Sequence, residues 1–356
     1  MQYFQTYVLG MPRVAGLKAD KGTTTHKALE CLACIKKLIQ DGQTKGIYQD
    51  SQLGPIEYDE QTWMKPHHLS DDEVDAINKT RRNKQTYKSL CKIPYGTVHY
   101  GVDLVNELAQ KSSDYYAERG AHKWKPVDFK DVKNFTYIPL EYKDGMFDPR
   151  RRTIVEAEPH FDITIDKPWA NYQYEHQGKI LDGQLAIKGT VDLITDIGGG
   201  IYEIVDWKTG QRIDWGAKGT PEKTYDKLCE DPQLMLYYYA CRNMYPDVKG
   251  IILSIFFVRD GGPFSICFDE HHLAHMEKLL EKKFKYTQNC TLPEMCDPNQ
   301  KDFKCTRICD FYKQKKNDKN MCRFIHDEIK DKGMQHVIDN HTEDGHNVGF
   351  YQNPGE

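Results

Sequence analysis

Three consecutive glycines, Gly198–Gly200, separate two runs that are rich in valine, isoleucine and aromatic residues. This pattern predicts a tight β-hairpin within residues 189–209. With Gly199 at the centre of antiparallel pairing, Asp192 lies directly opposite Asp206. Opposed residues in such a ladder have Cβ atoms about 5 Å apart, so their negative charges repel each other unless a cation lies between them.

A lysine joins these two acids on one face of the second strand. Because side chains alternate along a strand, Lys208 shares the face of Asp206 while Trp207 points away. An isolated Asp-x-Lys pair is typical of a solvated sheet edge, but the strand at 204–208 is apolar on both faces, which indicates a partly buried setting. Paired carboxylates bind hard divalent ions, and a neighbouring cation suits hydrolysis of a phosphodiester.

The length and composition allow a large folded core. The 356 residues are enough for one large domain with insertions or for two domains, and 39% of them are hydrophobic. Because the net charge is −4, any surface that binds nucleic acid must be local. Two basic clusters would suit that role, although solvated faces explain them equally well: Arg150–Arg152 and the lysines at 313, 315, 316 and 319.

The sequence shows no targeting or membrane signal. No stretch approaches the roughly 18 apolar residues of a membrane span, and the N-terminal residues do not resemble a signal peptide. Eleven cysteines without such a signal indicate reduced thiols or metal ligands and not a disulfide framework. We therefore expect a cytoplasmic or otherwise intracellular protein that is not secreted and does not bind a membrane.

The N-terminal part of the chain is predicted to be mainly helical. Apolar residues at helical spacing indicate an amphipathic helix over residues 24–40, and a polar loop is expected over 43–69. The sequence Ser70-Asp-Asp-Glu73 is a capping box, which predicts the start of a helix. A longer helix is expected over 101–119.

Strand patterns dominate after residue 150. Residues 153–165 alternate in part, the hairpin is expected over 186–208, and the apolar run at 250–258 predicts a strand buried on both faces. Asp231-Pro232 combines an N-cap with a proline at the first helical position, and Asp269 starts a further helix. This order predicts an α/β (α+β) fold in which helices flank a central mixed β-sheet.

Three blocks of the sequence place polar residues on the expected helices and strands. They are Gly22-Thr-Thr-Thr-His26-Lys-Ala-Leu-Glu30, then Gly189-Thr-Val-Asp192 with Ile204-Val-Asp206-Trp-Lys208-Thr, then Gln233-Leu-Met-Leu-Tyr237. In this order they resemble the motifs of the PD-(D/E)XK nuclease superfamily, in its RecB-like exonuclease branch. Those motifs are a glycine followed by a metal-binding histidine at a helix start, the catalytic hairpin, and Gln-x-x-x-Tyr on the next helix.

The resemblance implies a restriction-endonuclease-like core with a helical insertion. The expected segments are an N-terminal segment with the first-motif helix (1–42), a mostly helical insertion (43–150), the nuclease core with the catalytic hairpin (151–289), a cysteine-rich segment (290–325) and a polar tail (326–356).

The resemblance also implies roles for individual residues. His26, Asp192 and Asp206 would ligate Mg²⁺ or Mn²⁺, and the backbone carbonyl of Trp207 would complete the protein ligands. Lys208 would orient the attacking water or neutralise developing charge.

Several of these assignments have alternatives. Gln233 and Tyr237 lie four residues apart, hence on one helix face, and would support the catalytic site or contact the DNA backbone, or simply pack at a helix start. His26 is also compatible with a capping or core histidine. His99 is a rival for its role because it too follows a Gly-Thr pair, but the long apolar helix after Leu29-Glu30 favours His26.

Cys305, Cys309 and Cys322 form a C-terminal cluster. Some RecB-like nucleases hold a 4Fe-4S cluster with three such cysteines and one upstream of the first motif. The spacing here is wider, and no cysteine precedes Gly22, so the fourth iron ligand would be Cys31, Cys34 or Cys296, or would lie on an N-terminal segment that this sequence lacks. Zinc bound with the help of Cys296 is a local alternative, and free thiols are another.

Together these patterns favour a metal-dependent DNA nuclease, an exonuclease more than an endonuclease, in DNA recombination, repair or processing. The alternatives are a nucleic-acid-binding module with a non-catalytic nuclease fold, and a structural zinc protein built on residues 290–322. The expected partner is DNA. The sequence contains no Walker phosphate loop, so any helicase or recombination ATPase would be a separate protein.

Overall fold

The computed structural model describes residues 1–12, 16–81, 92–119, 124–176, 179–212, 223–295, 305 and 309–346. The chain divides into two compact units. One is Gly16–Glu281, and the other combines Met1–Ala15 with Lys282–Glu356. No helix within the described ranges has both the length and the apolar character that a bilayer crossing requires.

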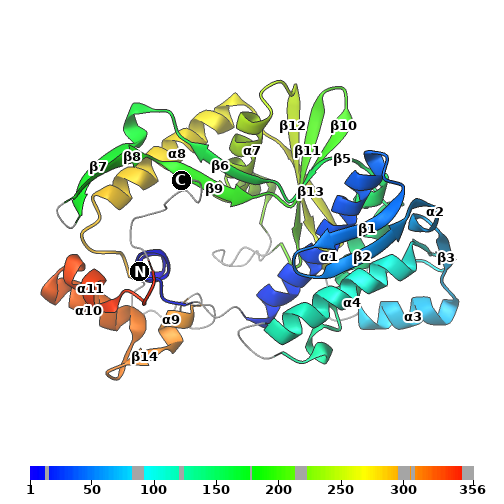
Figure 1. The fold of residues 1–356 in the computed structure, drawn as a ribbon, viewed down its shortest axis with the longest axis horizontal. Coiled ribbons are helices and arrows are strands. Elements are labelled where there is room, and N and C mark those ends of the chain that lie inside the picture. The colour runs from blue at the N-terminus through cyan, green and yellow to red at the C-terminus, as the bar shows by residue number, and fades with distance from the viewer. Residues whose placement is uncertain are drawn as a thin grey trace. The chain divides into compact units, whose positions relative to one another are not determined.

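A five-stranded mixed sheet lies at the centre of the larger unit (Figure 1). Its order is β13-β12-β11-β10-β5. Strands β11 and β12 are parallel, and the other neighbours are antiparallel. This confirms the expected mixed sheet. Its strands are β5 (Thr153–Ala157), β10 (Leu193–Gly198), β11 (Ile201–Lys208), β12 (Gly250–Phe257) and β13 (Gly262–Cys267).

The glycine turn closes the hairpin of β10 and β11 in the predicted register, with Leu193 opposite Val205. Gly198–Gly200 have φ of 92°, 67° and 81°, a backbone region that residues with a Cβ atom rarely adopt. The expected first arm from residue 186 was too long. Residues 186–190 form β9 (Ala186–Thr190), which pairs with β6 (His160–Thr164) in a separate ribbon.

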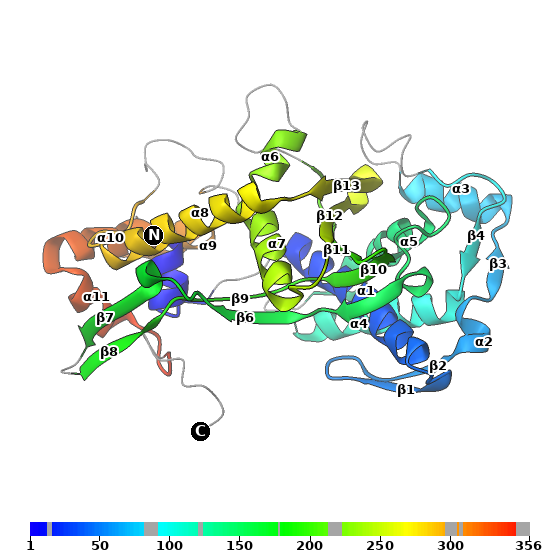
Figure 2. The ribbon, with the colours of Figure 1, turned by 90° about the horizontal axis from the view of Figure 1, so that it is seen from above.

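Helices cover both faces of the sheet. Figure 1 and Figure 2 show α1 (Leu17–Gln40) and α4 (Val102–Arg119) on one side and α7 (Pro232–Met244) on the other. The side chains of β11 alternate accordingly. Val205 and Trp207 pack in the core with α1, and Ile204 packs in the core with α7.

Helix α1 starts well before the expected residue 24. The residues before Gly22 are good helix formers, and Asp20 lies in the first turn, where an acid is favourable. The motif had predicted that His26 lies at the start of the helix. In the structure His26 lies inside it. The expected amphipathic character of the helix is confirmed, since the side chains of Leu29 and Leu32 are completely buried.

The segment 43–69, expected as a loop, contains a β-hairpin and a short helix. The Asp50 carboxylate accepts hydrogen bonds from the backbone of Gln52 and Leu53, both at 2.8 Å, which fixes a tight turn. Tyr58 and Ile56 bury one face of the hairpin, which stabilises strands that are otherwise polar. The elements are β1 (Lys45–Asp50), β2 (Gly54–Asp59), α2 (Glu60–Trp63) and β3 (Pro66–His68), which pairs with β4 (Val98–Tyr100).

The remaining elements of this unit follow the expected helix starts. Ser70 and Glu73 form the predicted capping box at α3, and Asp231 caps α7 by accepting a hydrogen bond from the Gln233 backbone. The other helices are α5 (Val132–Glu141), α6 (Tyr225–Cys229) and α8 (Glu270–Gln288), the last of which continues into the second unit. Strands β7 (Asn171–His176) and β8 (Lys179–Gln184) form a ribbon. The 3₁₀ turns are η3 (Pro126–Phe129), η4 (Pro149–Arg151), η5 (Pro168–Ala170) and η6 (Val258–Asp260). Helix α3 spans Asp71–Thr80.

The smaller unit has its own apolar core. Ile325, Ile329 and Val337 pack with Phe4 and Phe311. The expected polar tail therefore carries two helices as far as residue 341, because its few apolar residues recur at helical spacing. The elements are η1 (Phe4–Val8), α9 (Asp310–Lys313), β14 (Lys315–Lys316), β15 (Lys319–Asn320), α10 (Met321–Lys332) and α11 (Met334–His341).

Candidate active site

Two carboxylates meet at the open end of the glycine hairpin. Asp206 on β11 is 1% exposed, and its Oδ1 accepts a hydrogen bond from Lys208 Nζ at 2.9 Å. Its Oδ2 is buried and has no hydrogen-bond partner among the described residues. Asp192 lies one residue before β10, and its Oδ2 accepts a hydrogen bond from the Trp207 backbone at 2.8 Å. The hairpin thus places both acids where the register predicted.

The two acids differ in proton affinity. Burial raises the pKa of Asp206 to about 6, with a further increase from the charge of Asp192, while Lys208 opposes the change. Burial also disfavours the charged form of Asp192, but the charge and hydrogen bond of His26 outweigh it, and the pKa of Asp192 is lowered. Two close carboxylates behave in this way when no cation lies between them.

Helix α1 brings His26 to these acids. Its Nδ1 lies 3.4 Å from Asp192 Oδ1. Burial lowers the pKa of His26, but the charges of Asp192 and Asp206 raise it by more, so the net change is upward. The rival His99 is buried elsewhere, with Nδ1 2.8 Å from Glu141 Oε1. The structure therefore places His26, and not His99, beside the hairpin acids.

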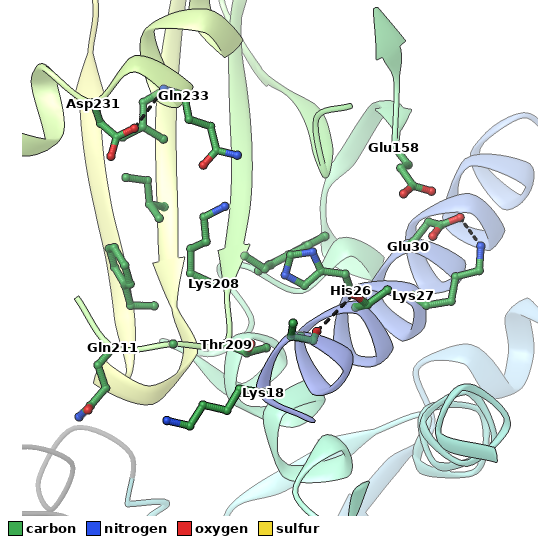
Figure 3. Close-up of a pocket in the computed structure, with 18 of the residues that line it drawn as sticks. Lys18, His26, Lys27, Glu30, Glu158, Lys208, Thr209, Gln211, Asp231 and Gln233 are labelled. Carbon is green, nitrogen blue, oxygen red and sulfur yellow. Dashed lines mark hydrogen bonds and ion pairs between the residues drawn. The ribbon is translucent and has the colours of Figure 1, made fainter. Parts of the chain in front are cut away.

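Lys208 and the third motif border the same cavity. Figure 3 shows Lys208 extending from β11 towards Gln233, which belongs to the first turn of α7. Gln233 Nε2 donates a hydrogen bond to Tyr237 Oη at 2.9 Å. Burial raises the pKa of Tyr237 to about 12, and the charge of Asp206 contributes in the same direction. The two residues of the Gln-x-x-x-Tyr motif are thus joined to each other and lie within electrostatic reach of the acids.

The cavity has a volume of about 700 Å³ and follows one side of α1. Lys18, Gly22 and His26 border it at four-residue spacing, which places them on one helix face. A Cβ atom at Gly22 would lie 3.0 Å from Thr209 Oγ1. Glycine therefore allows α1 to approach the end of β11 closely, which is what brings His26 to the hairpin.

A second charged group, which the sequence motifs do not mark, lies at the other end of the cavity. Figure 3 shows Glu30 and Glu158 there, beyond His26. Lys27 Nζ lies 2.7 Å from Glu30 Oε1. Burial raises the pKa of Glu30 to about 8; Lys27 opposes the change, and a hydrogen bond with Glu158 adds to it.

Glu158 is also strained. Its φ is 49°, in the left-handed region, and its N–H donates to the Asp192 carbonyl at 3.0 Å. Glu30 could have been found from the sequence because it lies one turn beyond His26 on the same helix. Glu158 gave no such signal, since its place depends on the bend between β5 and β6.

The basic cluster Arg150–Arg152 is divided by the fold. Arg150 is 4% exposed and pairs with Asp148 at 2.8 Å. Arg152 forms a buried ion pair with Glu203. Arg151 is the exposed member of the three. Only one of these arginines is therefore available to a partner, which the sequence pattern did not distinguish.

The second basic cluster lies in the smaller unit. Lys315, Lys316 and Lys319 belong to the ribbon of β14 and β15, and Lys313 ends α9. Lys319 pairs with Asp327 at 2.7 Å. This pairing reduces the positive charge that the ribbon presents.

The clustered cysteines also belong to the smaller unit. A hydrogen bond with Cys309 raises the pKa of the Cys322 thiol, and burial adds to it. Cys322 Sγ also donates to Gln5 Oε1 at 3.2 Å. Cys305 is half-buried, and Cys296 lies outside the described residues. A thiol must lose its proton before it binds a metal, and a raised pKa opposes that loss. Binding of an iron–sulfur cluster or of zinc by these cysteines stays a prediction.

No three His, Cys, Asp or Glu side chains in the described ranges converge into a preformed metal site. The donors at the hairpin nevertheless fit a divalent ion. Asp206 Oδ2 is a buried acceptor without a partner, and a second carboxylate and an imidazole lie beside it. Carboxylates suit both Mg²⁺ and Mn²⁺.

Comparison with known proteins identifies the family of the chain. A solved structure from Eubacterium rectale, described as a "Putative exonuclease", is similar with a TM-score of 0.30 and 11% identity, over 55% of this chain and 72% of that chain. That likeness is too distant to inform function. No curated protein gives a significant match. The model of the PD-(D/E)XK nuclease superfamily matches residues 1–314. The chain therefore belongs to the PD-(D/E)XK nuclease superfamily, whose members hydrolyse nucleic acids with the help of divalent metal ions.

Proposed function

We propose that the chain is a divalent-metal-dependent deoxyribonuclease that degrades DNA from its ends, like the RecB-like exonucleases whose motifs it resembles. The observation that carries this proposal is the buried Oδ2 of Asp206, which has no hydrogen-bond partner among the described residues and lies beside a second carboxylate and a lysine. A buried acceptor without a partner costs about 1–3 kcal/mol, which a bound cation would recover.

Three side chains would hold the ion. They are His26, Asp192 and Asp206, and the backbone carbonyl of Trp207 stays a predicted fourth ligand. When bound, a Mg²⁺ or Mn²⁺ ion supplies Lewis-acid stabilisation of phosphate charge and lowers the pKa of a water molecule.

Lys208 acts in this proposal as a positive charge. Burial lowers the pKa of Lys208, but the charges of Asp206 and Asp192 raise it by more, so the ammonium stays protonated at neutral pH. A protonated lysine cannot accept a proton from water. Its contribution is therefore to orient the nucleophile and to stabilise charge that develops on the phosphate.

The third motif positions the substrate. The side chain of Gln233 is exposed and borders the cavity, and its hydrogen bond to Tyr237 fixes the orientation of both groups. An amide presented in this way can donate to a phosphate oxygen, a type of contact that fixes register without reading sequence. Degradation without sequence specificity requires contacts of this kind.

The cavity favours the end of a strand. A volume of about 700 Å³ is in the range that encloses a single ligand and not a duplex. Lys18 lies at one end, and Glu30 and Glu158 lie at the other (Figure 3). Phosphates are favoured near Lys18, while the carboxylate of Glu158 repels a backbone that continues past it.

The test is a nuclease assay on end-labelled linear DNA and on closed circular DNA, single- and double-stranded, with Mg²⁺, Mn²⁺ or EDTA. Lys208→Ala and Asp192→Ala should abolish cleavage while the protein stays folded. Lys37→Ala on α1, which removes an exposed pair with Asp41, is the matched control.

Metal-dependent loss of linear DNA that spares closed circles would support an exonuclease. Cutting of closed circles would make the protein an endonuclease. DNA binding without cleavage under any condition would favour the non-catalytic binding module. Wild-type rates in either site variant would refute the site assignment. A role in recombination, repair or processing, with a separate helicase as partner, stays a prediction from the resemblance.

A further inference from the structure

A second cavity, of about 640 Å³, lies in the larger unit and shares no lining residue with the catalytic cavity. We call it the tyrosine cavity, because three tyrosines and three exposed cations border it. They are Tyr95, Tyr100, Tyr142, Lys92, Lys143 and Arg151.

The charge of this cavity is unusual for an acidic chain. None of Lys92, Lys143 and Arg151 forms an ion pair with another described residue. The buried Arg81 and Glu141 of the wall pair with each other at 3.1 Å. Three cations without an ion pair among the described residues thus border the hollow, and the exposed Asp144 is the acid beside them. A third cavity shows the opposite balance, since its charged lining includes Glu57, Asp59, Asp103 and Glu107 beside Lys45 and Lys65.

The cations stand next to aromatic faces. The Arg151 guanidinium lies 4.7 Å from the centre of the Tyr100 ring, and the Lys143 ammonium lies 5.5 Å from that of Tyr142. The Tyr95 ring is 64% exposed, and its hydroxyl donates to Asp75 at 2.9 Å, which holds the ring in place. The cavity therefore offers the exposed Tyr95 ring as a stacking surface, beside two half-buried rings, Tyr100 and Tyr142, each with a cation over one face.

One wall is built in a strained conformation. Lys143, Asp144 and Gly145 have φ of 43°, 58° and 87°, three successive left-handed residues. Arg151 donates a hydrogen bond to the Asp144 carbonyl. A Cβ atom at Gly145 would lie 2.7 Å from Arg151 Cδ. The glycine thus makes room for the arginine, and the strained turn places two of the three cations on this wall.

The wall is attached to the central sheet. The Tyr142 ring packs edge-on against Phe256 of β12, with ring centres 5.4 Å apart. The neighbours of Phe256 in sequence, Ile255 and Phe257, border the catalytic cavity. One strand therefore supports both cavities.

We propose that the tyrosine cavity binds single-stranded nucleic acid outside the catalytic cavity. Lys92, Lys143 and Arg151 contact phosphates, and the tyrosine rings stack with unpaired bases. A cavity of this size takes single unstacked nucleotides and excludes a duplex. A free phosphate or an acidic peptide would satisfy the cations but would leave the three rings without a role. The choice of nucleic acid as ligand rests on the proposed function.

Binding is measured by fluorescence anisotropy of a labelled oligothymidylate in EDTA. The double variant Lys143→Ala/Arg151→Ala should bind roughly tenfold more weakly or worse, as expected for lost hydrogen bonds to charged groups. The slope of log affinity against log salt should fall by about 1.4, since each phosphate contact to a single strand contributes about 0.7. The control is Lys45→Ala/Lys65→Ala in the third cavity, whose charged lining is mainly acidic. This control should leave both the affinity and the salt slope unchanged.

A dinucleotide substrate separates this proposal from the proposed function. It needs only the catalytic cavity, so the double variant should cleave it at the wild-type rate, while KM for a long strand rises. If the wild type cleaves neither substrate, the proposed function fails, but the anisotropy result still decides whether the tyrosine cavity binds a strand.

A second variant guards against a folding defect. Gly145→Ala keeps every charge but pushes Arg151 aside, and the left-handed backbone at this position means that the melting temperature should fall somewhat. Weaker binding, measured at a temperature where the variant is still fully folded, would support the proposal. Wild-type affinity in the double variant would overturn it. So would equal affinity for duplex DNA, or displacement of the oligonucleotide by inorganic phosphate or polyglutamate as effectively as by unlabelled oligothymidylate.

Discussion

Replacing Asp206 by asparagine removes a buried charge whose cost follows from the structure. Burial raises the pKa of Asp206 to about 6, against 3.8 for an ordinary carboxyl, a difference worth about 3 kcal/mol. Asparagine keeps an acceptor for Lys208 but leaves that ammonium without its counter-charge, which offsets part of the gain. We expect metal-free Asp206→Asn to be about 1–3 kcal/mol more stable than the wild type at neutral pH.

Because the pKa of Asp206 is raised, the stability gained by Asp206→Asn should depend on pH. A carboxyl with a raised pKa holds its proton in the folded protein at pH values where the unfolded chain has lost it. The wild-type protein therefore loses stability through Asp206 as the pH rises from about 4 through 6. The advantage of Asp206→Asn should be small near pH 4 and complete near pH 7.

The assay is urea unfolding in EDTA across this pH range, with exposed Asp41→Asn as the control. Saturation with Mg²⁺ should then make the wild type more stable than Asp206→Asn. A ligand at a hundred times its Kd stabilises the folded state by about 2.7 kcal/mol, and the variant should gain much less. If Asp206→Asn destabilises the metal-free protein at neutral pH, or if its advantage does not change with pH, the buried-charge reasoning is wrong.

Three further substitutions test the fold. Arg152→Ala leaves Glu203 buried without its ion-pair partner, and urea unfolding should show a loss of about 3–5 kcal/mol. Gly189→Ala forces a Cβ atom into the ring of Phe161, and the same assay should show a loss of about 1–3 kcal/mol. Ser70→Ala removes the capping box, and hydrogen exchange in the first turn of α3 should report a loss of about 1 kcal/mol. Unchanged stability in any of them would contradict the packing or capping described.

The sequence predicted the features that depend on neighbouring residues. The glycine turn and strand alternation fix the hairpin register, so Asp206 and Lys208 could be placed on one face before the structure was known. The capping box at Ser70 and the N-cap at Asp231 are similarly local, and both start helices where expected.

The errors concern contacts between distant segments. The strand at residues 186–190 looked like part of the glycine hairpin, but it pairs with β6 because the chain bends at Asp192, directly after the Val191 N–H that donates to the Pro159 carbonyl at 3.1 Å. The β1–β2 hairpin was missed because its polar strands are stabilised by burial of Ile56 and Tyr58 against other elements. Neither contact leaves a periodic signal in the sequence.

The candidate site likewise contains residues that the local sequence could place and residues that depend on contacts between distant segments. The acids and the lysine are close in sequence and could be assigned from the hairpin alone. The choice between His26 and His99 needed the resemblance to a family, because both follow Gly-Thr and precede helices. Glu158 had no sequence signal, since only the bend after β5 brings it to Asp192.

Trp207 has one further consequence. Its indole is 1% exposed in the core with α1, while its backbone N–H holds the Asp192 carboxylate. A single residue thus ties the interior of the protein to the spacing of the two acids. Heat or denaturant that loosens this interior also separates the acids. Inactivation and melting of the larger unit should therefore coincide, with no intermediate temperature at which a folded but inactive enzyme accumulates.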